Sequence, residues 1–283
     1  MMIEKLSDES PLSLVRGGEL RLFFIGVGSA FSKSLFQNNI IITKGRDHLM
    51  VDCGTLAPLA LSRLGLPLGE IRNYFITHIH LDHTGGLEEV ALSTRYGTKK
   101  KPRVFIPDYF EDLLWNGSLR GGCAYNERAG GKPLAFADFF DVRRPRWIPD
   151  SPRETWEFSV GSIKLKIFRT KHIPDSAAGW EDSYPSFGLV VDDRVLFSGD
   201  TRFDPEMVRD YGGGPEIETI FHDCQLFTGG VHASLEEIGA LPAKTKKKTL
   251  LMHYQENWKD AEASARNAGF AGFAQRNTFY VFP

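Results

Sequence analysis

The chain has 283 residues, of which 42% are hydrophobic and 25% are charged, and this composition is ordinary for a soluble globular protein. Its 34 basic and 36 acidic residues leave a formal net charge of −2, which argues against a protein that coats nucleic acid. The polar segment 1–20 has no apolar core of the signal-peptide type, and no apolar run approaches the roughly 20 residues that span a bilayer. We therefore expect a cytoplasmic protein without membrane contact.

The three cysteines, Cys53, Cys123 and Cys224, are widely spaced and form no C-x-x-C pair. An odd number of cysteines at this spacing argues against a disulfide framework and against a cysteine-based zinc site. We interpret each of them as a small buried apolar side chain in a reducing compartment.

The first part of the chain alternates between apolar runs and helical patterns. Short apolar runs that end in Gly or polar turn residues predict strands over 20–28, 38–43, 48–54, 71–77 and 103–107. Apolar residues at helical spacing predict helices over 55–65, 85–97 and 109–115. This alternation indicates an α/β architecture.

Residues 117–160 differ from the rest, because they are rich in Gly, Pro, Arg and aromatic residues and lack periodicity. We expect an irregular insert, which either connects elements on the surface or serves as a substrate lid or dimer contact. Within it, "RRPRW" (143–147) either meets a phosphate and a base by charge and stacking or is a solvated linker.

We expect the whole chain, 1–283, to form one domain. Its second half again contains short apolar runs that are typical of strands. Strands are predicted over 162–170, 187–193, 194–200, 218–225, 248–254 and 278–283, and helices over 234–241 and 260–269. The basic run "KTKKK" (244–248) follows a proline and precedes a strand, so we expect a solvated turn there in place of an RNA-binding patch.

The segment "FITHIHLDHTGG" (75–86) places His78, His80, Asp82 and His83 in a strand-to-helix loop. Ligands of α/β proteins bind at this edge of the sheet, where strands end. His78 and His80 are two residues apart and point the same way, whereas Asp82 and His83 come from the next turn and can face a second point. Two adjacent binding points suit a two-metal site, and imidazoles with a carboxylate suit Zn, Mn or Fe.

Three more donor residues stand where apolar strands stop, namely His172, Asp200 and His253. Seven such residues at the ends of four strands favour a bound pair of divalent ions over scattered polar side chains. His48 lies outside this pattern, and we interpret it as structural or solvated.

The pattern H-x-H-x-D-H, followed at strand ends by His, Asp and His, resembles the metallo-β-lactamase superfamily over residues 20–254. The resemblance implies an αββα sandwich of two mixed sheets flanked by helices, with the site at one edge. It implies one ion held by His78, His80 and His172, a second held by Asp82, His83 and His253, and Asp200 as the bridge between them. We also count Asp82 among the catalytic residues.

Two divalent ions, with zinc expected and manganese or iron as alternatives, would lower the pKa of a shared water to about 7 and so provide a nucleophile. The zinc β-lactamases commonly carry Cys at the position of Asp200. A bridging carboxylate is instead typical of hydrolases that act on phosphodiesters, lactones and thioesters.

A second informative stretch, "FHDCQLFTGGVHASLEEIGAL" (221–241), contains His222, Asp223 and His232. The residues either end a strand and cap a helix, or they form a carboxylate–histidine pair that protonates a leaving oxygen. We place Asp223 and His232 in the catalytic set and expect His222 close behind the ligands.

This stretch resembles the tRNA 3′-end endonuclease branch of the superfamily, whose His-Glu-Ala-Thr and His-Ser-Thr motifs correspond to His222-Asp223 and His232. The opening "GVGSA" (26–30) is also similar. The same scaffold occurs in metal-dependent cyclic-nucleotide phosphodiesterases, including phage-encoded anti-Pycsar enzymes that degrade cyclic CMP and cyclic UMP. Such enzymes are expected to be homodimers.

Three departures separate the chain from the endonucleases: Asp223 replaces Glu, Cys224-Gln225 replaces Ala-Thr, and no long basic arm is present. We therefore predict a two-metal phosphodiesterase that acts on a small cyclic nucleotide. The alternatives are a tRNA 3′-end endonuclease, a lactonase or thioesterase, and a non-enzymatic ligand-binding module. The last would be marked by a lost metal ligand, and all seven are in place.

Overall fold

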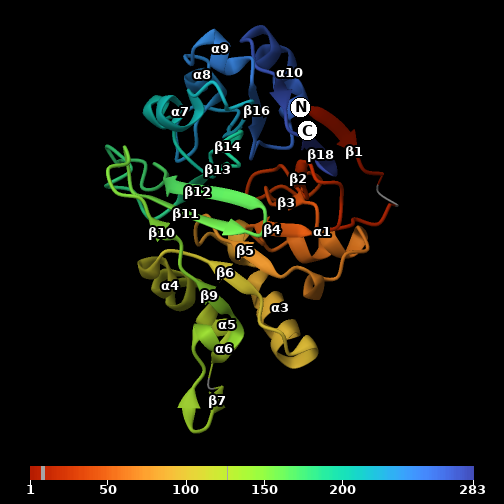
Figure 1. Ribbon diagram of the computed structural model, residues 1–283. Helices are drawn as coiled ribbons and strands as arrows, with labels where there is room; N and C mark the ends of the chain where they lie inside the picture. Colours follow the sequence, from red (N-terminus) through yellow and green to blue (C-terminus); the bar gives the residue numbers. More distant parts are fainter. Residues whose placement is uncertain (8–9, 126) are drawn as a thin grey trace. The chain divides into compact units, whose positions relative to one another are not determined.

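The fold is given by a computed structural model, which describes residues 1–7, 10–125 and 127–283 (Figure 1). The chain divides into two compact units. The amino-terminal unit comprises residues 2–26, 39–145 and 277–283, and the carboxy-terminal unit comprises residue 1 and residues 27–38 and 146–276. Each unit contains one eight-stranded sheet.

The sheet of the amino-terminal unit is antiparallel on one side and parallel on the other. Its strands, in spatial order, are β1 (Met2–Lys5), β18 (Thr278–Phe282), β2 (Leu20–Phe24), β3 (Ile40–Lys44), β4 (Asp47–Val51), β5 (Asn73–Phe75), β6 (Arg103–Phe105) and β9 (Asp141–Arg143). The pairs from β1 to β4 are antiparallel, and those from β4 to β9 are parallel. Polar side chains that follow β4 and β5 therefore emerge at one edge.

Helical segments connect the parallel strands of this unit. They are α1 (Ala57–Arg63), the 3₁₀ turn η1 (Leu68–Glu70), α2 (Leu81–Thr84), α3 (Leu87–Leu92), the π-helical η2 (Ser93–Thr98), α4 (Asp108–Leu114), the π-helical η3 (Trp115–Leu119), α5 (Arg120–Ala124) and α6 (Phe136–Phe139). Between α5 and α6, the hairpin of β7 (Arg128–Ala129) and β8 (Lys132–Pro133) extends away from the sheet of this unit (Figure 1).

The carboxy-terminal unit repeats the plan of a mixed sheet. Its strands, in spatial order, are β10 (Arg146–Trp147), β11 (Thr155–Val160), β12 (Ile163–Arg169), β13 (Phe187–Val191), β14 (Val195–Phe197), β15 (Thr219–Asp223), β16 (Thr249–Met252) and β17 (Gly272–Phe273). The pairs from β10 to β14 are antiparallel, and those from β14 to β17 are parallel.

Four helices belong to this unit: α7 (Pro205–Gly212), α8 (Leu235–Ile238), α9 (Ala243–Lys246) and α10 (Trp258–Asn267). Helix α7 starts at Asp204, whose carboxylate accepts a hydrogen bond from the Met207 backbone amide, with Pro205 in the first turn. A side chain on Gly212 would come within 3.0 Å of Leu196 and Ile220, so the helix packs closely on β14 and β15.

The two mixed sheets and their helices agree with the predicted α/β class, whereas the prediction of a single domain over 1–283 stays a prediction. The expected irregular insert over 117–160 is wrong in detail, because these residues form α5, α6 and strands β7 to β11. Most of these elements are two to five residues long, too short for a periodic pattern to show. Helix α7 was missed, and part of "KTKKK" is helical, in α9.

Two smaller interpretations are confirmed. All three cysteines are free and buried. His48 is structural, since its Nε2 accepts a hydrogen bond from the Arg72 amide at 3.0 Å. Within the described residues, no helix has both the length and the apolar character that crossing a membrane requires.

Candidate metal centre

The histidine motif forms a loop and one short helix that follow β5 in the amino-terminal unit. His80 stands at the start of α2, and its carbonyl accepts hydrogen bonds from the amides of His83 and Thr84, both at 2.9 Å. This single turn returns Asp82 and His83 toward His78. The side chains of His78, Asp82 and His83 are buried, and His80 is half-buried.

The donor atoms of this cluster lie at separations that suit a shared ion. His78 Nε2 is 2.9 Å from His80 Nδ1, and His83 Nε2 is 3.1 Å from Asp82 Oδ2. Zinc–nitrogen bonds of about 2.0–2.1 Å place two ligands of one ion roughly 3 Å apart. The two pairs also agree with the two binding points expected from the motif spacing.

Asp52, which the sequence analysis missed, holds one of these histidines in place. Its Oδ2 lies 2.7 Å from His83 Nδ1, and it accepts hydrogen bonds from the hydroxyl and the amide of Thr77, both at 2.7 Å. A carboxylate on Nδ1 leaves Nε2 of His83 as the atom for a metal. Burial raises the pKa of Asp52 above its usual value, and the interactions with His83 and Thr77 oppose that effect. The signal was available in part, because Asp52 directly follows the apolar residues Leu49–Val51, with which strand β4 ends.

The carboxy-terminal unit collects a second cluster at the ends of four strands. His172 follows β12, Asp200 follows β14, Asp223 ends β15 and His253 follows β16. His253 adopts φ of +60°, an uncommon conformation for a residue with a side chain, so the backbone turns sharply at the ligand position. Donor atoms of His172, Asp200 and His232 lie within 4.8 Å of one another, as do those of Asp223, His232 and His253.

The individual distances in this cluster define its network. His253 Nε2 is 3.3 Å from Asp200 Oδ2. His172 Nδ1 donates to the carbonyl of Val231 at 2.9 Å, which leaves Nε2 of that ring for a metal. The rings of His232 and His253 are stacked with centroids 4.6 Å apart.

Asp223 and His232 form the expected carboxylate–histidine pair. His232 Nδ1 is 2.7 Å from Asp223 Oδ2, and the same carboxylate accepts a hydrogen bond from the Thr201 amide at 2.8 Å. Asp223 is fully buried, and the His232 side chain retains 20% exposure. Although burial by itself raises the pKa of Asp223, His232 and His253 together hold it below its usual value. The carboxylate is therefore ionised and orients the outward Nε2 of His232.

His222 is buried on β15, one residue before Asp223, so its ring lies on the opposite face of the strand. Its Nδ1 donates to the carbonyl of Asp223 at 2.7 Å, and burial lowers its pKa. It thus contacts the backbone of Asp223. The predicted place of His222 close behind the metal ligands stays a prediction.

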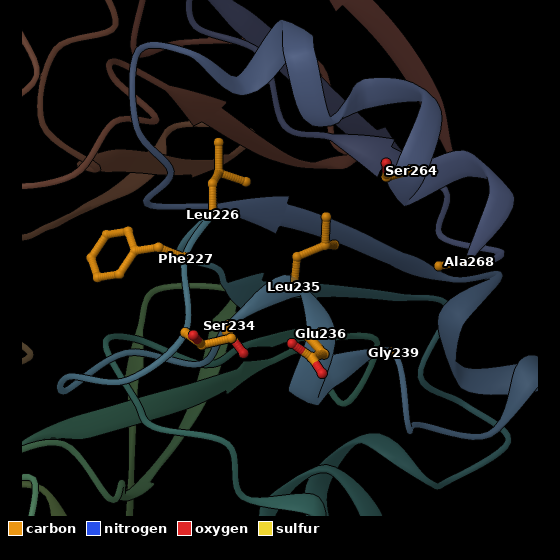
Figure 2. A pocket seen from close by; sticks show the side chains of 9 residues that line it. Leu226, Phe227, Ser234, Leu235, Glu236, Gly239, Ser264 and Ala268 are labelled. Carbon is orange, nitrogen blue, oxygen red and sulfur yellow. The ribbon is translucent and has the colours of Figure 1, made fainter.

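A pocket of about 410 Å³ lies beside the loop that connects Asp223 with His232. It is lined by Leu226–Thr228 of the loop, by residues of and next to helix α8, by Ser264 of α10 and by Ala268, which directly follows α10 (Figure 2). The ring of Phe227 points away from Ser264 and Ala268 (Figure 2), and the side chain is 58% exposed. Leu226 is tied to the segment after His253, since its amide donates to Gln255 Oε1 at 2.7 Å.

The predicted residues thus fall into two clusters, each within one unit. Both contain only imidazole nitrogens and carboxylate oxygens, the donor chemistry that suits Zn, Mn or Fe. The division into one ion on His78, His80 and His172 and a second on Asp82, His83 and His253, with Asp200 as bridge, stays a prediction from the resemblance.

Comparison with known proteins adds the family. Residues 20–280 match the family of the anti-Pycsar protein Apyc1. The chain belongs to this family. Curated relatives include the anti-Pycsar protein Apyc1 of Paenibacillus harenae, 39% identical over 83% of this chain and 90% of the relative. Another is that of Bacillus phage 010DV004, 34% identical over 93% of this chain and 98% of the relative.

Solved structures confirm the fold. The metallo-β-lactamase fold protein YhfI of Bacillus subtilis is 14% identical and aligns with a TM-score of 0.67 over 93% of this chain and all of that one. The short form of human tRNase Z is 18% identical, with a TM-score of 0.63 over 93% and 99% of the two chains. The predicted metallo-β-lactamase fold is therefore confirmed. The family, the fold and the donor clusters all agree with a metal-dependent hydrolase.

Proposed function

We propose that this protein is a two-metal phosphodiesterase that hydrolyses a small cyclic nucleotide. The observation that carries the proposal is the pair of Asp223 and His232, joined at 2.7 Å and grouped with His253. Opening a cyclic phosphodiester releases a poorly leaving ribose oxygen that must gain a proton, and such a pair can supply it. The relatives that are named anti-Pycsar proteins support a role in the same class.

The imidazole nitrogens and carboxylate oxygens of the two clusters support the proposal of a pair of divalent ions. We propose that His78, His80 and His172 hold one ion, that Asp82, His83 and His253 hold the other, and that Asp200 contacts both. Bound there, the two ions would supply Lewis acidity and an acidified water. Zinc is the first expectation, with manganese and iron as alternatives.

The chain itself supplies orientation and the proton. Asp52 and the Val231 carbonyl fix the rings of His83 and His172 through Nδ1. Asp223 fixes His232 in the same way and stabilises its positive charge, so that Nε2 of His232 can donate to the departing oxygen as the phosphorus–oxygen bond breaks. Water contributes the hydroxyl that remains on phosphorus, and its proton replaces the one that His232 gives up.

The charge balance supports a small substrate over a long RNA. A net charge of −2 gives no general basic field, and phosphate-backbone binding depends on many such charges. A lactonase or thioesterase would leave the buried pair of Asp223 and His232 without a task.

The proposal is tested with purified, metal-loaded protein on four substrate classes: 3′,5′-cyclic nucleotides, a 3′-extended tRNA precursor, a homoserine lactone and a thioester. We expect turnover of cyclic nucleotides with kcat/KM at least 100-fold above that of the other three. Preferred cleavage of the tRNA precursor would assign the protein to RNA processing, and preferred hydrolysis of the lactone or thioester would assign it to acyl transfer.

We also propose a cytoplasmic homodimer, as the resemblance suggests. Light scattering coupled to size exclusion should give twice the chain mass of 31.8 kDa. A fully active species of the single chain mass would contradict this part of the proposal.

A further inference from the structure

Phe31 stands out in the carboxy-terminal unit because 88% of its surface is exposed, the largest value among the large apolar side chains that the structure describes. An exposed phenylalanine contributes no hydrophobic free energy to folding, and the face of its ring is accessible for stacking. Its neighbours in the loop 29–34 are Ser29, Ala30, Ser32, Lys33 and Ser34. A single exposed ring in a loop that also exposes Lys33 and Ser34 suits a flat charged ligand better than an apolar protein surface, which would require a wider patch.

The loop that carries Phe31 is held firmly at its second half. Glu256 accepts hydrogen bonds from the amides of Lys33 and Ser34 at 2.7 and 2.9 Å and from the Ser34 hydroxyl. Arg276 donates to the carbonyl of Ser34 at 2.8 Å. Such a loop presents the ring at a defined place.

The first half of the loop is anchored to Tyr254, the residue that follows the candidate metal ligand His253. The Ser29 amide donates to the carbonyl of Tyr254 at 3.0 Å, and the Ser32 amide closes the turn on the Ser29 carbonyl at 3.0 Å. The close turn needs glycine at residue 28, because a Cβ there would lie 2.4 Å from the Ser32 side chain. Both anchors, Tyr254 and Glu256, thus belong to the three residues that follow His253.

We propose that Phe31 is a specificity-determining residue that stacks on the base of the nucleotide substrate. This inference rests on the proposed cyclic-nucleotide activity and deepens it. The segment 254–256 couples the loop to His253, so a phosphate at the metal ligands and a base on Phe31 are held by one continuous scaffold. Stacking is tolerant of base identity, since every base has a π-face, and it is stronger for purines than for pyrimidines.

The test compares Phe31→Ala, Phe31→Trp and wild type on 3′,5′-cyclic AMP, 3′,5′-cyclic UMP and an abasic 3′,5′-cyclic ribose phosphate. We expect Phe31→Ala to raise KM for cyclic AMP about tenfold, with a smaller rise for cyclic UMP, an almost unchanged kcat and no change on the abasic substrate. Phe31→Trp should retain or improve the KM values. Leu59→Ala, which removes an exposed apolar side chain of the amino-terminal unit, serves as the matched control and should change none of them.

A binding readout accompanies the kinetics. The fluorescence of the indole that Phe31→Trp adds should be quenched by a non-hydrolysable phosphorothioate analogue of cyclic AMP. The same titration of wild type is subtracted, since it reports the quenching of the other tryptophans. Unchanged KM values in Phe31→Ala, or an equal loss on the abasic substrate, would overturn the stacking role while wild-type turnover upholds the phosphodiesterase. A changed oligomeric mass in Phe31→Ala would assign the ring to a subunit contact and also overturn it. A wild type that hydrolyses no cyclic nucleotide would refute the proposed function and this inference together.

Discussion

His83 and His172 each donate a hydrogen bond from Nδ1, one to Asp52 and the other to the carbonyl of Val231. These hydrogen bonds occupy Nδ1, so that a metal ion would bind through Nε2 of each ring. Asp223 acts on His232 in the same way. At the residue scale, the groups that accept hydrogen bonds from Nδ1 therefore fix the orientation of each imidazole ring.

Asp52→Asn tests the control of His83. Asparagine suits the positive φ of +62° at this position and keeps the acceptor for the Thr77 amide, so the backbone should be preserved. An amide group facing His83 Nδ1 favours the tautomer with its proton on Nε2, and we expect metal affinity to fall by about 10- to 100-fold. Competitive titration with a metal indicator measures it, and unchanged affinity would show that Asp52 is only a packing residue.

Asp223→Asn tests the proton donor. We expect kcat to fall about 10²- to 10⁴-fold on a cyclic nucleotide, because His232 loses the counter-ion that stabilises its protonated, proton-donating form. A diester with a p-nitrophenolate leaving group needs no proton and should be affected far less. Asp193→Asn, at an exposed hairpin turn of the same unit, is the control. Equal losses on both substrates would argue that Asp223 acts on the metal site as a whole.

At the scale of elements, the parallel half of each sheet positions the donors. Strands β4 and β5 end beside Asp52 and the histidine motif, and strands β14, β15 and β16 end at Asp200, Asp223 and His253. Since parallel strands point the same way, the polar residues that follow their carboxyl ends lie at the same edge of the sheet. How precisely these donor side chains are positioned depends on how closely neighbouring strands pack.

Gly188→Ala probes this packing in β13. Gly188 pairs with Phe168 of β12, and a Cβ there would lie 2.6 Å from the buried Phe168 ring and 2.8 Å from the carbonyl of Ser198. We expect a loss of about 1–3 kcal/mol in the free energy of unfolding from overpacking. Urea denaturation measures it, with Gly214→Ala as the control because a Cβ there would meet only the flexible end of Glu216. A neutral Gly188→Ala would mean that β12 and β13 separate more readily than their packing indicates.

At the scale of the whole molecule, the buried His222 and the half-buried His48, both outside the candidate ligand set, link stability to pH. Burial lowers the pKa of His222 and of His48 below the ordinary value of 6.5. The unfolded chain therefore takes up protons at a higher pH than the folded chain does. The free energy of unfolding should stay level above about pH 6.5 and decline below it.

Urea midpoints of the metal-free protein at pH 7.5 and 5.5, in the presence of a chelator, measure this decline. One proton contributes at most about 1.4 kcal/mol per pH unit. The His222→Gln variant should show a smaller decline than wild type because it lacks one of the two protonation sites. Identical declines in the two proteins would show that other groups cause the acid sensitivity.

The sequence by itself predicted the candidate donor residues and determined the fold class, which solved structures confirm. The motif H-x-H-x-D-H and the polar residues at the ends of apolar strands are local features, and local hydrophobic patterning is what defines a strand and its end. Strands β7 to β10 are too short for such a pattern to show. Asp52 was missed, although it also directly follows a strand.

Only the tertiary structure decided which partner each ring has. The 2.7 Å contacts of Asp52 with His83 and of Asp223 with His232 join residues 31 and 9 positions apart, and the exposure of Phe31 depends on anchors at Tyr254 and Glu256. Hydrogen bonds between residues far apart in the sequence depend on how strands are ordered and packed, and composition and motif spacing do not predict that order. For this protein, the sequence therefore predicts the donor residues, and the tertiary structure shows which atoms each of them contacts.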